Sequence, residues 1–314
     1  MKTVLLSKFR VSSIILAIIV FAVSVCSFNS MPANSANTAK GYTKFNAETG
    51  AQIGTYSLTV QYGEQPAPRD IIGSDDRYID WTKSGVVKIF SDGHYRGTGF
   101  VVGRHEIATA AHVLTSSDNG VVSGIKISEI KLFNADGSVA KKITCPTNSD
   151  DAEIAKRKME YHIPTPFLVK GRNFNYDFAV IKIPEDLKDY QCFDVGYPTD
   201  SFVNSTSSIV TVTGFPQFVG GLKVNDDKKD SMYTGVGRIF LNGYDTNIFI
   251  RYTTDTAPGN SGSPIYVTET VRGETFYTVI GIHIQGSVTF NKGIRFDSDI
   301  LKFLKGNPQV QEWG

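Results

Sequence analysis

Gly259-Asn260-Ser261-Gly262-Ser263-Pro264 places one serine between two glycines, and two further motifs precede this stretch in the chain. They are Ala110-Ala111-His112 and Tyr176-Asp177-Phe178, each beside an apolar run that is typical of a β-strand. Each motif alone is weak evidence, because a serine among glycines is usually a turn and a lone histidine or aspartate is usually structural. Their order along the chain, His then Asp then Ser, indicates nucleophilic catalysis by a serine.

Three residues have the side chains that acyl transfer to a serine requires. A serine hydroxyl is a poor nucleophile at neutral pH, so it needs a base beside it and a third group that holds the base in one tautomer. Ser261 is the candidate nucleophile, His112 the candidate base and Asp177 the group that orients it. Glycines at 259 and 262 let the backbone turn tightly, so the amides of Gly259 and Ser261 can point together at an oxyanion.

Six blocks of the chain match the pattern of one protease family. They are Ile72-Gly73-Ser74-Asp75-Asp76-Arg77, Gly97-Thr98-Gly99-Phe100-Val101-Val102-Gly103 running into Ala110-Ala111-His112, Asp177-Phe178-Ala179-Val180-Ile181, Val212-Thr213-Gly214-Phe215-Pro216, the serine block, and Gly281-Ile282-His283. Through them the chain resembles the glutamyl endopeptidase branch of the chymotrypsin-like serine proteases, a type that Gram-positive bacteria secrete. The resemblance covers most of residues 70–314 and implies that His112, Asp177 and Ser261 form the catalytic triad.

The beginning of the chain predicts a targeting signal. Basic residues precede an apolar run over 14–26, which is typical of a secretory signal peptide. The run is shorter than the roughly 20 residues that a membrane-spanning helix needs. We expect the signal peptide over 1–27, with its end somewhere between 24 and 39, and no membrane association of the chain after its removal.

A propeptide is expected between the signal peptide and the mature enzyme. The stretch 28–69 is polar, weak in periodicity and ends in Gln65-Pro66-Ala67-Pro68-Arg69. The resemblance aligns Asp70 with the first residue of the mature enzyme, which implies cleavage after Arg69.

The rest of the chain predicts an all-β fold. Short β-rich runs separated by Gly, Asn, Asp and Pro favour antiparallel barrels or sandwiches over a βαβ fold. Only the end is helical by pattern, with Asp297 or Ser298 as the cap and Ile300, Leu301 and Leu304 on one face. The resemblance implies two six-stranded antiparallel β-barrels with this short C-terminal α-helix. We expect the first barrel over 70–198, with His112 and Asp177, and the second over 199–314, with Ser261; the linker lies near 196–207.

Composition excludes several other functions. The apolar fraction of 41% is typical of a globular protein, and a net charge of +1 gives no reason to expect a nucleic-acid partner. The charge runs Lys156-Arg157-Lys158 and Asp226-Asp227-Lys228-Lys229-Asp230 are interpreted as solvated loops. We expect no metal and no cofactor, because no His-x-x-x-His or Cys-x-x-Cys spacing indicates zinc; calcium in a surface loop stays open. His94 and His105 are interpreted as surface or hairpin residues, and His162 as part of a loop.

Two cysteines remain after removal of the signal peptide. Cys145 and Cys192 either form one disulfide across the first barrel, as an exported protein allows, or stay separate thiols. The sequence leaves both alternatives open.

Thr256 and His283 are the candidate residues for substrate specificity. In the enzymes that the chain resembles, a hydroxyl and an imidazole of this kind donate hydrogen bonds to a glutamate carboxylate. A pocket for Glu must supply donors or positive charge, because a buried carboxylate without partners is costly. The resemblance also makes the new α-amino group of Asp70 a third contributor.

Asp255 supports an alternative specificity. By count it stands six residues before the serine, where trypsin-like enzymes carry the aspartate that binds Arg or Lys. An Asp255 that faced the pocket would repel Glu, but His283 would then have no role. Asn260 directly precedes the serine, so the chain lacks the aspartate that pairs with the new N-terminus in animal digestive enzymes.

The leading hypothesis is a secreted, monomeric serine endopeptidase that cuts proteins or peptides after Glu, and less well after Asp, through an acyl-enzyme. One alternative keeps the triad and gives it Arg or Lys specificity through Asp255. The other, from a different class, is a protease-like binding protein without catalytic function. Labelling of Ser261 by a fluorophosphonate would distinguish the enzyme from the binding protein.

Overall fold

The computed structural model describes residues 39–47, 51–58, 74–145, 158–169, 172–241, 246–287, 289–305 and 312–313. These residues belong to one unit that spans Thr38–Gly314. The expected signal peptide, the expected cleavage after Arg69 and the site residue Asp70 lie outside the described residues. Among the described residues, no helix has the length and the apolar character to cross a membrane.

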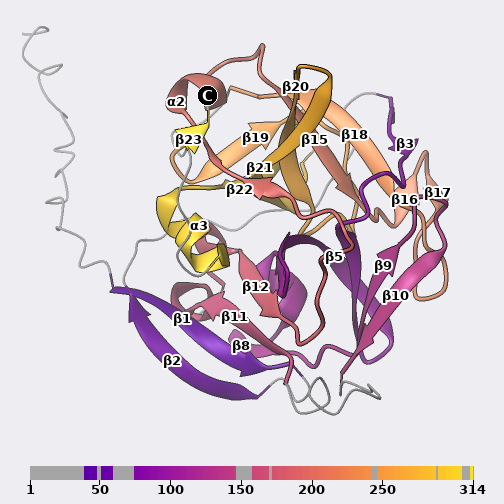
Figure 1. Ribbon diagram of the computed structural model, residues 1–314. Coiled ribbons are helices and arrows are strands. Elements are labelled where there is room, and N and C mark those ends of the chain that lie inside the picture. The colour runs from indigo at the N-terminus through magenta and orange to yellow at the C-terminus, as the bar shows by residue number, and fades with distance from the viewer. Residues whose placement is uncertain are drawn as a thin grey trace, which may run out of the picture. The chain divides into compact units, whose positions relative to one another are not determined.

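The first sheet has nine strands, all joined to their neighbours in antiparallel pairs (Figure 1). It carries the N-terminal half of the unit, with four strands from 86–133 at its centre. In spatial order the strands are β10 (Val139–Thr144), β9 (Glu129–Phe133), β4 (Val86–Ser91), β5 (His94–Gly103), β6 (Glu106–Thr109), β12 (Ala179–Lys182), β11 (Glu160–Pro164), β1 (Ala39–Asn46) and β2 (Gln52–Leu58).

The second sheet has eight strands and carries most of the C-terminal half. Its main path is β19 (Phe249–Tyr252), β22 (Asn291–Arg295), β21 (Glu274–Gln285), β20 (Pro264–Val271), β15 (Ile209–Gly214), β18 (Tyr233–Arg238) and β3 (Tyr78–Ile79), and β13 (Asp194–Val195) pairs in parallel with β21. Three small two-stranded sheets are formed by β7 (Thr115–Asp118) with β8 (Val121–Gly124), β14 (Tyr197–Pro198) with β23 (Glu312–Trp313), and β16 (Phe218–Val219) with β17 (Leu222–Lys223).

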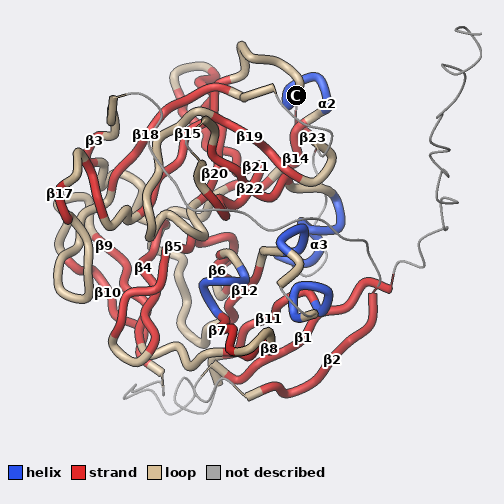
Figure 2. Tube along the Cα trace, turned by 180° about the vertical axis from the view of Figure 1, so that it is seen from behind, coloured by secondary structure: helices blue, strands red, loops and turns tan. Residues whose placement is uncertain are grey.

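The few helices are short (Figure 2). Within the described ranges they are the 3-10 helices η1 (Ala111–Leu114), η2 (Thr165–Leu168) and η3 (Phe174–Tyr176) and the α-helices α2 (Asp200–Val203) and α3 (Ser298–Lys305). The all-β fold class and the C-terminal helix are confirmed. In α3 the predicted cap is present: Asp297 Oδ1 accepts the amides of Asp299 and Ile300 at 2.9 and 2.8 Å.

The strands form because their apolar residues fill the space between and inside the two sheets. All six residues of β4 are buried, and so are most of β5. The β-rich runs over 86–90, 99–102, 178–183, 209–212, 248–252, 278–283 and 292–296 lie in β4, β5, β12, β15, β19, β21 and β22. Strands β5 and β21 begin five and four residues before their runs, and all other ends agree within two residues. Strands β20 and β21 form a long hairpin that turns through Arg272 and Gly273, both at positive φ.

Part of the stretch expected to be a propeptide extends the first sheet. Strand β1 pairs with β11 over five residues, with Phe45 opposite Tyr161. The two rings stack with their centroids 5.1 Å apart, and Phe45 is 3% exposed. The Ala47 amide donates to the Met159 carbonyl at 3.0 Å. The weak periodicity of this stretch gave no sign of such a hairpin, because β1 pairs with β11, which is more than a hundred residues away in the sequence.

These strands bear on three further sequence interpretations. His162 lies in β11 and is buried, so the expectation that it sits in a loop was wrong. Cys145 is buried beside β10 and Cys192 is exposed, and no disulfide joins these two described residues. Strands β3 and β13, although they fall in the range expected for the first barrel, pair with the second sheet.

Candidate active site

His112 and Asp177 form a hydrogen-bonded pair between two segments of the first sheet. His112 lies in η1, directly after β6, and Asp177 lies between η3 and β12, which pairs with β6. The fully buried Asp177 accepts the His112 ring Nδ1 at 2.6 Å and the His112 amide at 2.8 Å. Because a carboxylate only accepts, Nδ1 carries the proton and the lone pair of His112 is on Nε2. This is the tautomer that a general base needs.

The turn around Ser261, residues 259–264, which we call the serine turn, is held between the two sheets. The Thr98 amide, on β5, donates to the Ser261 carbonyl at 2.9 Å. On the other side, the Gly262 amide donates to the His283 carbonyl at 2.8 Å, and the His283 amide donates to the Ser263 carbonyl at 2.9 Å. Ser261 is therefore fixed by the backbone of β5 and of β21, far from it in sequence.

Gly262 is required at its position by both conformation and space. Its φ is +87°, in a region that residues other than glycine rarely adopt. A Cβ on Gly262 would lie 2.0 Å from the Thr98 carbonyl oxygen and 3.1 Å from the amide nitrogen of Ala110. The serine turn is thus packed directly against the segment that leads into His112, which brings the candidate nucleophile and base into one neighbourhood.

The peptide groups on both sides of Gly259 are fixed by hydrogen bonds to their carbonyls. The Gln217 amide donates to the Pro258 carbonyl at 2.6 Å. The Gly259 carbonyl accepts Thr98 Oγ1 at 2.8 Å and the Tyr95 hydroxyl at 2.7 Å. Because the C=O and N–H of a trans peptide point in opposite directions, the first bond directs the Gly259 amide away from Gln217.

Thr256 and His283 are both buried: Thr256 lies in the connection between β19 and β20, and His283 lies on β21, whose backbone is hydrogen-bonded to the serine turn. His283, on β21, is 3% exposed, and its Nδ1 lies 2.5 Å from the hydroxyl of Tyr252 on β19. Burial, with a smaller contribution from His112, lowers the pKa of His283 to about 3, so the ring is neutral at neutral pH. Thr256 is 1% exposed, and its Oγ1 has no hydrogen-bond partner among the described residues.

Asp255 faces the segment 74–77, which lies close to the expected start of the mature chain. Its Oδ2 accepts the amide of Asp76 at 3.4 Å, and the residue is 4% exposed. Asp76 stands next to Asp75, which forms a bidentate pair with Arg77 at 2.8 and 2.7 Å. Asn260 has a local structural role, because its Oδ1 accepts the Ala257 amide at 3.0 Å within the turn.

Sequence analysis missed three side chains around this site. Thr98 and Tyr95 hold the Gly259 carbonyl, and buried Lys88 binds the loop that follows β15. Thr98 lies in a block that was recognised, but its hydroxyl gave no signal of its own. The interpretation of residues 226–230 as a solvated loop was also incomplete, since Asp230 pairs with Lys88 at 2.8 Å.

Among the described residues, no three His, Cys, Asp or Glu side chains gather as metal ligands.

Similar proteins agree with this architecture. A glutamyl endopeptidase of Bacillus licheniformis is 25% identical over 247 residues, which are 75% of this chain and 68% of that protein. A glutamyl endopeptidase of Staphylococcus epidermidis is 27% identical over 221 residues, which are 68% of this chain and 63% of that protein. A solved structure of a Glu endopeptidase superposes with a TM-score of 0.55 at 20% identity, over 75% of this chain and 98% of the other, and shows the shared fold.

The Trypsin-like peptidase domain family matches residues 97–274. This range contains His112, Asp177 and Ser261 and is more than half of the 314 residues. The chain therefore belongs to the trypsin-like peptidase domain family.

Proposed function

We propose that this chain is a secreted serine endopeptidase that cleaves peptide bonds after Glu, and less well after Asp, through an acyl-enzyme. The observation that carries the proposal is the His112–Asp177 pair beside a serine turn whose neighbouring peptides are held in place. The glutamyl endopeptidases among its relatives suggest the specificity. Secretion is part of the proposal because the N-terminal run is typical of a signal peptide.

The proposed reaction uses each triad residue in one role. Ser261 Oγ attacks the carbonyl carbon of the substrate while its proton passes to Nε2 of His112. Asp177 keeps the ring oriented and stabilises the imidazolium that forms. The amides of Gly259 and Ser261 bind the oxyanion. His112 then gives its proton to the leaving amine, and a water, activated by the same ring, hydrolyses the acyl-enzyme.

Specificity for Glu is assigned to Thr256 and His283. The Tyr252 hydroxyl has a proton to donate and burial raises its pKa well above the usual value, so it donates to Nδ1 of His283. The remaining ring proton of neutral His283 is then on Nε2, where it can donate to a substrate. A buried hydroxyl without a hydrogen-bond partner, such as that of Thr256, is energetically costly unless a ligand supplies the missing hydrogen bond. Two such donors suit one carboxylate.

The α-amino group of Asp70 is proposed as a third ligand of the carboxylate. It would exist only after cleavage behind Arg69, so pocket formation would follow removal of the propeptide. The short distance along the chain from Asp70 to Asp76, whose amide meets Asp255 beside Thr256, supports this placement.

Specificity for Arg or Lys through Asp255 has less support. The Asp255 carboxylate accepts the Asp76 amide, and the two uncharged groups of Thr256 and His283 supply no negative charge for a cation. A non-catalytic binding protein has no observation of its own in its favour, because the tautomer of His112 and the glycines of the serine turn are those of an active enzyme.

The test is a digest of a mixed peptide library, with the cleavage sites determined by mass spectrometry. The chain without its signal peptide is used before and after limited proteolysis that cuts behind Arg69, and Ser261→Ala is the control. We expect cuts after Glu, fewer after Asp, and none in the control. Cuts after Arg or Lys would contradict the pocket, and undiminished cleavage by the Ser261→Ala variant would contradict the nucleophile.

A further inference from the structure

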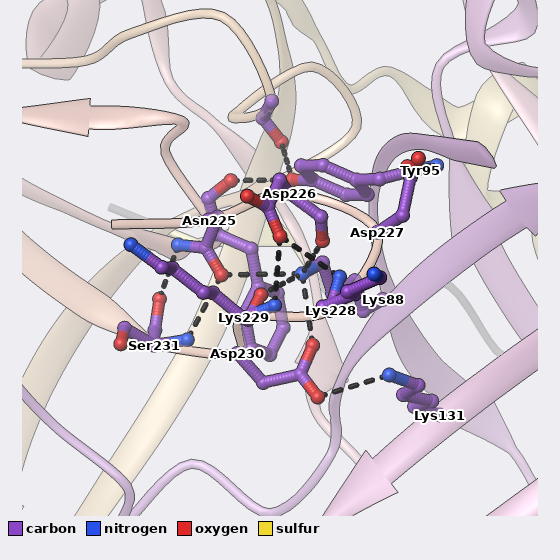
Figure 3. Close-up of polar contacts among 12 residues, drawn as sticks. Lys88, Tyr95, Lys131, Asn225, Asp226, Asp227, Lys228, Lys229, Asp230 and Ser231 are labelled. Carbon is purple, nitrogen blue, oxygen red and sulfur yellow. Dashed lines mark hydrogen bonds and ion pairs between the residues drawn. The ribbon is translucent and has the colours of Figure 1, made fainter. Parts of the chain in front are cut away.

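Lys88 is a fully buried lysine on β4 that binds a loop of the other sheet. We call this loop, Pro216–Ser231 between β15 and β18, the 216–231 loop. The Lys88 ammonium lies 2.8 Å from the Asp230 carboxylate and close to two backbone carbonyls, at 2.9 Å from that of Asp226 and 2.6 Å from that of Lys229 (Figure 3). Burying a charge is costly without partners, so these contacts fix the loop firmly to the first sheet.

A first route leads from Lys88 to Gly259 through the backbone of the 216–231 loop. The Lys88 ammonium donates to Asn225 Oδ1 at 3.3 Å. The side-chain nitrogen of Asn225, Nδ2, donates to the carbonyls of Pro216 and Ser231 at 2.7 and 2.6 Å. Asn225 thus closes the loop on itself.

The closed loop sets the position of Gln217. The Gln217 amide donates to the Pro258 carbonyl, and this bond determines the direction of the Gly259 amide. A loop released from Lys88 would lose this restraint.

A second route passes through Tyr95 on β5. The Lys88 ammonium lies 4.3 Å from the centroid of the Tyr95 ring, which is a cation–π contact. The Tyr95 amide donates to Asp227 Oδ1 at 2.8 Å, in the same loop. The Tyr95 hydroxyl donates to the Gly259 carbonyl at 2.7 Å and also reaches the Phe215 carbonyl. Lys88 therefore supports the peptides on both sides of Gly259.

We propose that Lys88 is a positioning residue for the Gly259 amide, acting through the 216–231 loop and through Tyr95. The inference rests on the proposed function, because the proposed function gives that amide its part in binding the oxyanion. Lys88 itself contacts no reacting atom. Its loss is expected to weaken binding of the transition state and to leave binding of the uncleaved substrate unchanged, since the Glu pocket is built by other residues.

The first experiment removes only one hydroxyl, in the variant Tyr95→Phe. The matched control is Tyr161→Phe, because Tyr161 is also buried in the first sheet and its hydroxyl also donates to a backbone carbonyl, that of Ile125 at 2.8 Å. Losing a whole oxyanion donor lowers kcat by about 100- to 1000-fold, so loosening one is expected to lower it by about tenfold. We expect this loss in Tyr95→Phe with KM unchanged, and wild-type kcat in Tyr161→Phe.

The second experiment compares two lysines that share one carboxylate. Lys131 pairs with the other oxygen of Asp230 at 2.9 Å, whereas Lys88 also binds the loop carbonyls. We expect Lys88→Met to lower kcat by about ten- to a hundredfold and Lys131→Met to leave it within about twofold of wild type. Binding of an uncleaved Glu peptide, measured in the Ser261→Ala background, should be the same with and without Lys88→Met. Should Lys88→Met fail to fold, Tyr95→Phe alone decides.

Hydrogen exchange separates this inference from the proposed function. Exchange of the amides in residues 257–262 is followed by mass spectrometry in the intact chain, which requires no activity. Faster exchange in Tyr95→Phe and Lys88→Met than in their two controls is the expected result. Unchanged exchange, or a loss of activity that appears in KM alone, would overturn the positioning role. A wild-type chain that neither cuts peptides nor reacts with a fluorophosphonate would overturn the proposed function. The exchange rates would still test whether Lys88 and Tyr95 hold the Gly259 amide in place.

Discussion

The hydroxyl of Tyr252 lies 2.5 Å from Nδ1 of His283, and both side chains are buried. The two residues come from β19 and β21, the strands on either side of β22, and are 31 positions apart in the sequence. Because the Tyr252 hydroxyl donates to Nδ1, the one ring proton of neutral His283 is on Nε2. A neutral donor held in this way recognises a carboxylate through geometry rather than through net charge.

Removing the Tyr252 hydroxyl should weaken recognition of Glu. In Tyr252→Phe the His283 ring can place its proton on either nitrogen, so the donor toward the substrate is present only part of the time. We expect KM for a Glu substrate to rise by about tenfold, which corresponds to about 1.4 kcal/mol, with a smaller change in kcat. Steady-state kinetics with paired Glu and Gln peptides would measure the effect. Thr256→Val should act in the same direction, and Thr256→Ser should retain wild-type KM.

Burial of neutral His283 should make the protein less stable in acid. Its pKa is about 3 in the folded chain and about 6.5 in the unfolded chain, so between these pH values the unfolded state binds the extra proton. The contribution of His283 to stability is therefore lost as pH falls from about 6.5 toward 3, by about 1.4 kcal/mol per pH unit.

Urea denaturation of the Ser261→Ala chain between pH 7 and 4 would measure this slope. In His283→Gln the fall in stability toward pH 4 should be shallower, because the replacement does not titrate. His94→Gln is the control, since His94 is largely exposed. Equal slopes in His283→Gln and in the parent would show that the imidazole of His283 does not govern acid stability.

Gly262→Ala should disrupt the serine turn. The positive φ disfavours alanine, and the new methyl group would lie 2.0 Å from the Thr98 carbonyl oxygen, with backbone on both sides. We expect a loss of at least about 2 kcal/mol of stability and of all measurable cleavage. Gly273→Ala is a matched control, because Gly273 also has positive φ but has open space around it. A Gly262→Ala chain with wild-type melting temperature would contradict the packing described here.

Phe45 should stabilise the uncut chain through the hairpin of β1 and β2. Its ring is buried on Tyr161, so Phe45→Ala is expected to cost about 3 kcal/mol in the free energy of unfolding. Phe276→Ala, which truncates an exposed phenylalanine on β21, should cost well under half as much. Denaturation of the uncut chain gives both values. Equal costs would mean that the hairpin does not contribute to the cooperative unit.

The local parts of the fold and the site were predictable from sequence. The strand runs, the cap of α3 and the turn glycines all depend on residues within a few positions of one another. The pairing of His112 with Asp177 was also predicted, through the resemblance, and the structure places them 2.6 Å apart. The hairpin at 39–58 was not, since its order comes from β11, about a hundred residues away.

By itself the sequence determined the residue types of the candidate triad, the turn around Ser261 and the β-rich character of the chain. Tertiary structure alone decided how those parts are held: Tyr95 reaches the Gly259 carbonyl from the other sheet, Lys88 binds the 216–231 loop, Tyr252 sets the proton on His283, and Asp255 meets the amide of Asp76. The physical reason is that a hydrogen bond or ion pair between residues 30 to 180 positions apart depends on how two sheets pack, and no local pattern encodes that distance.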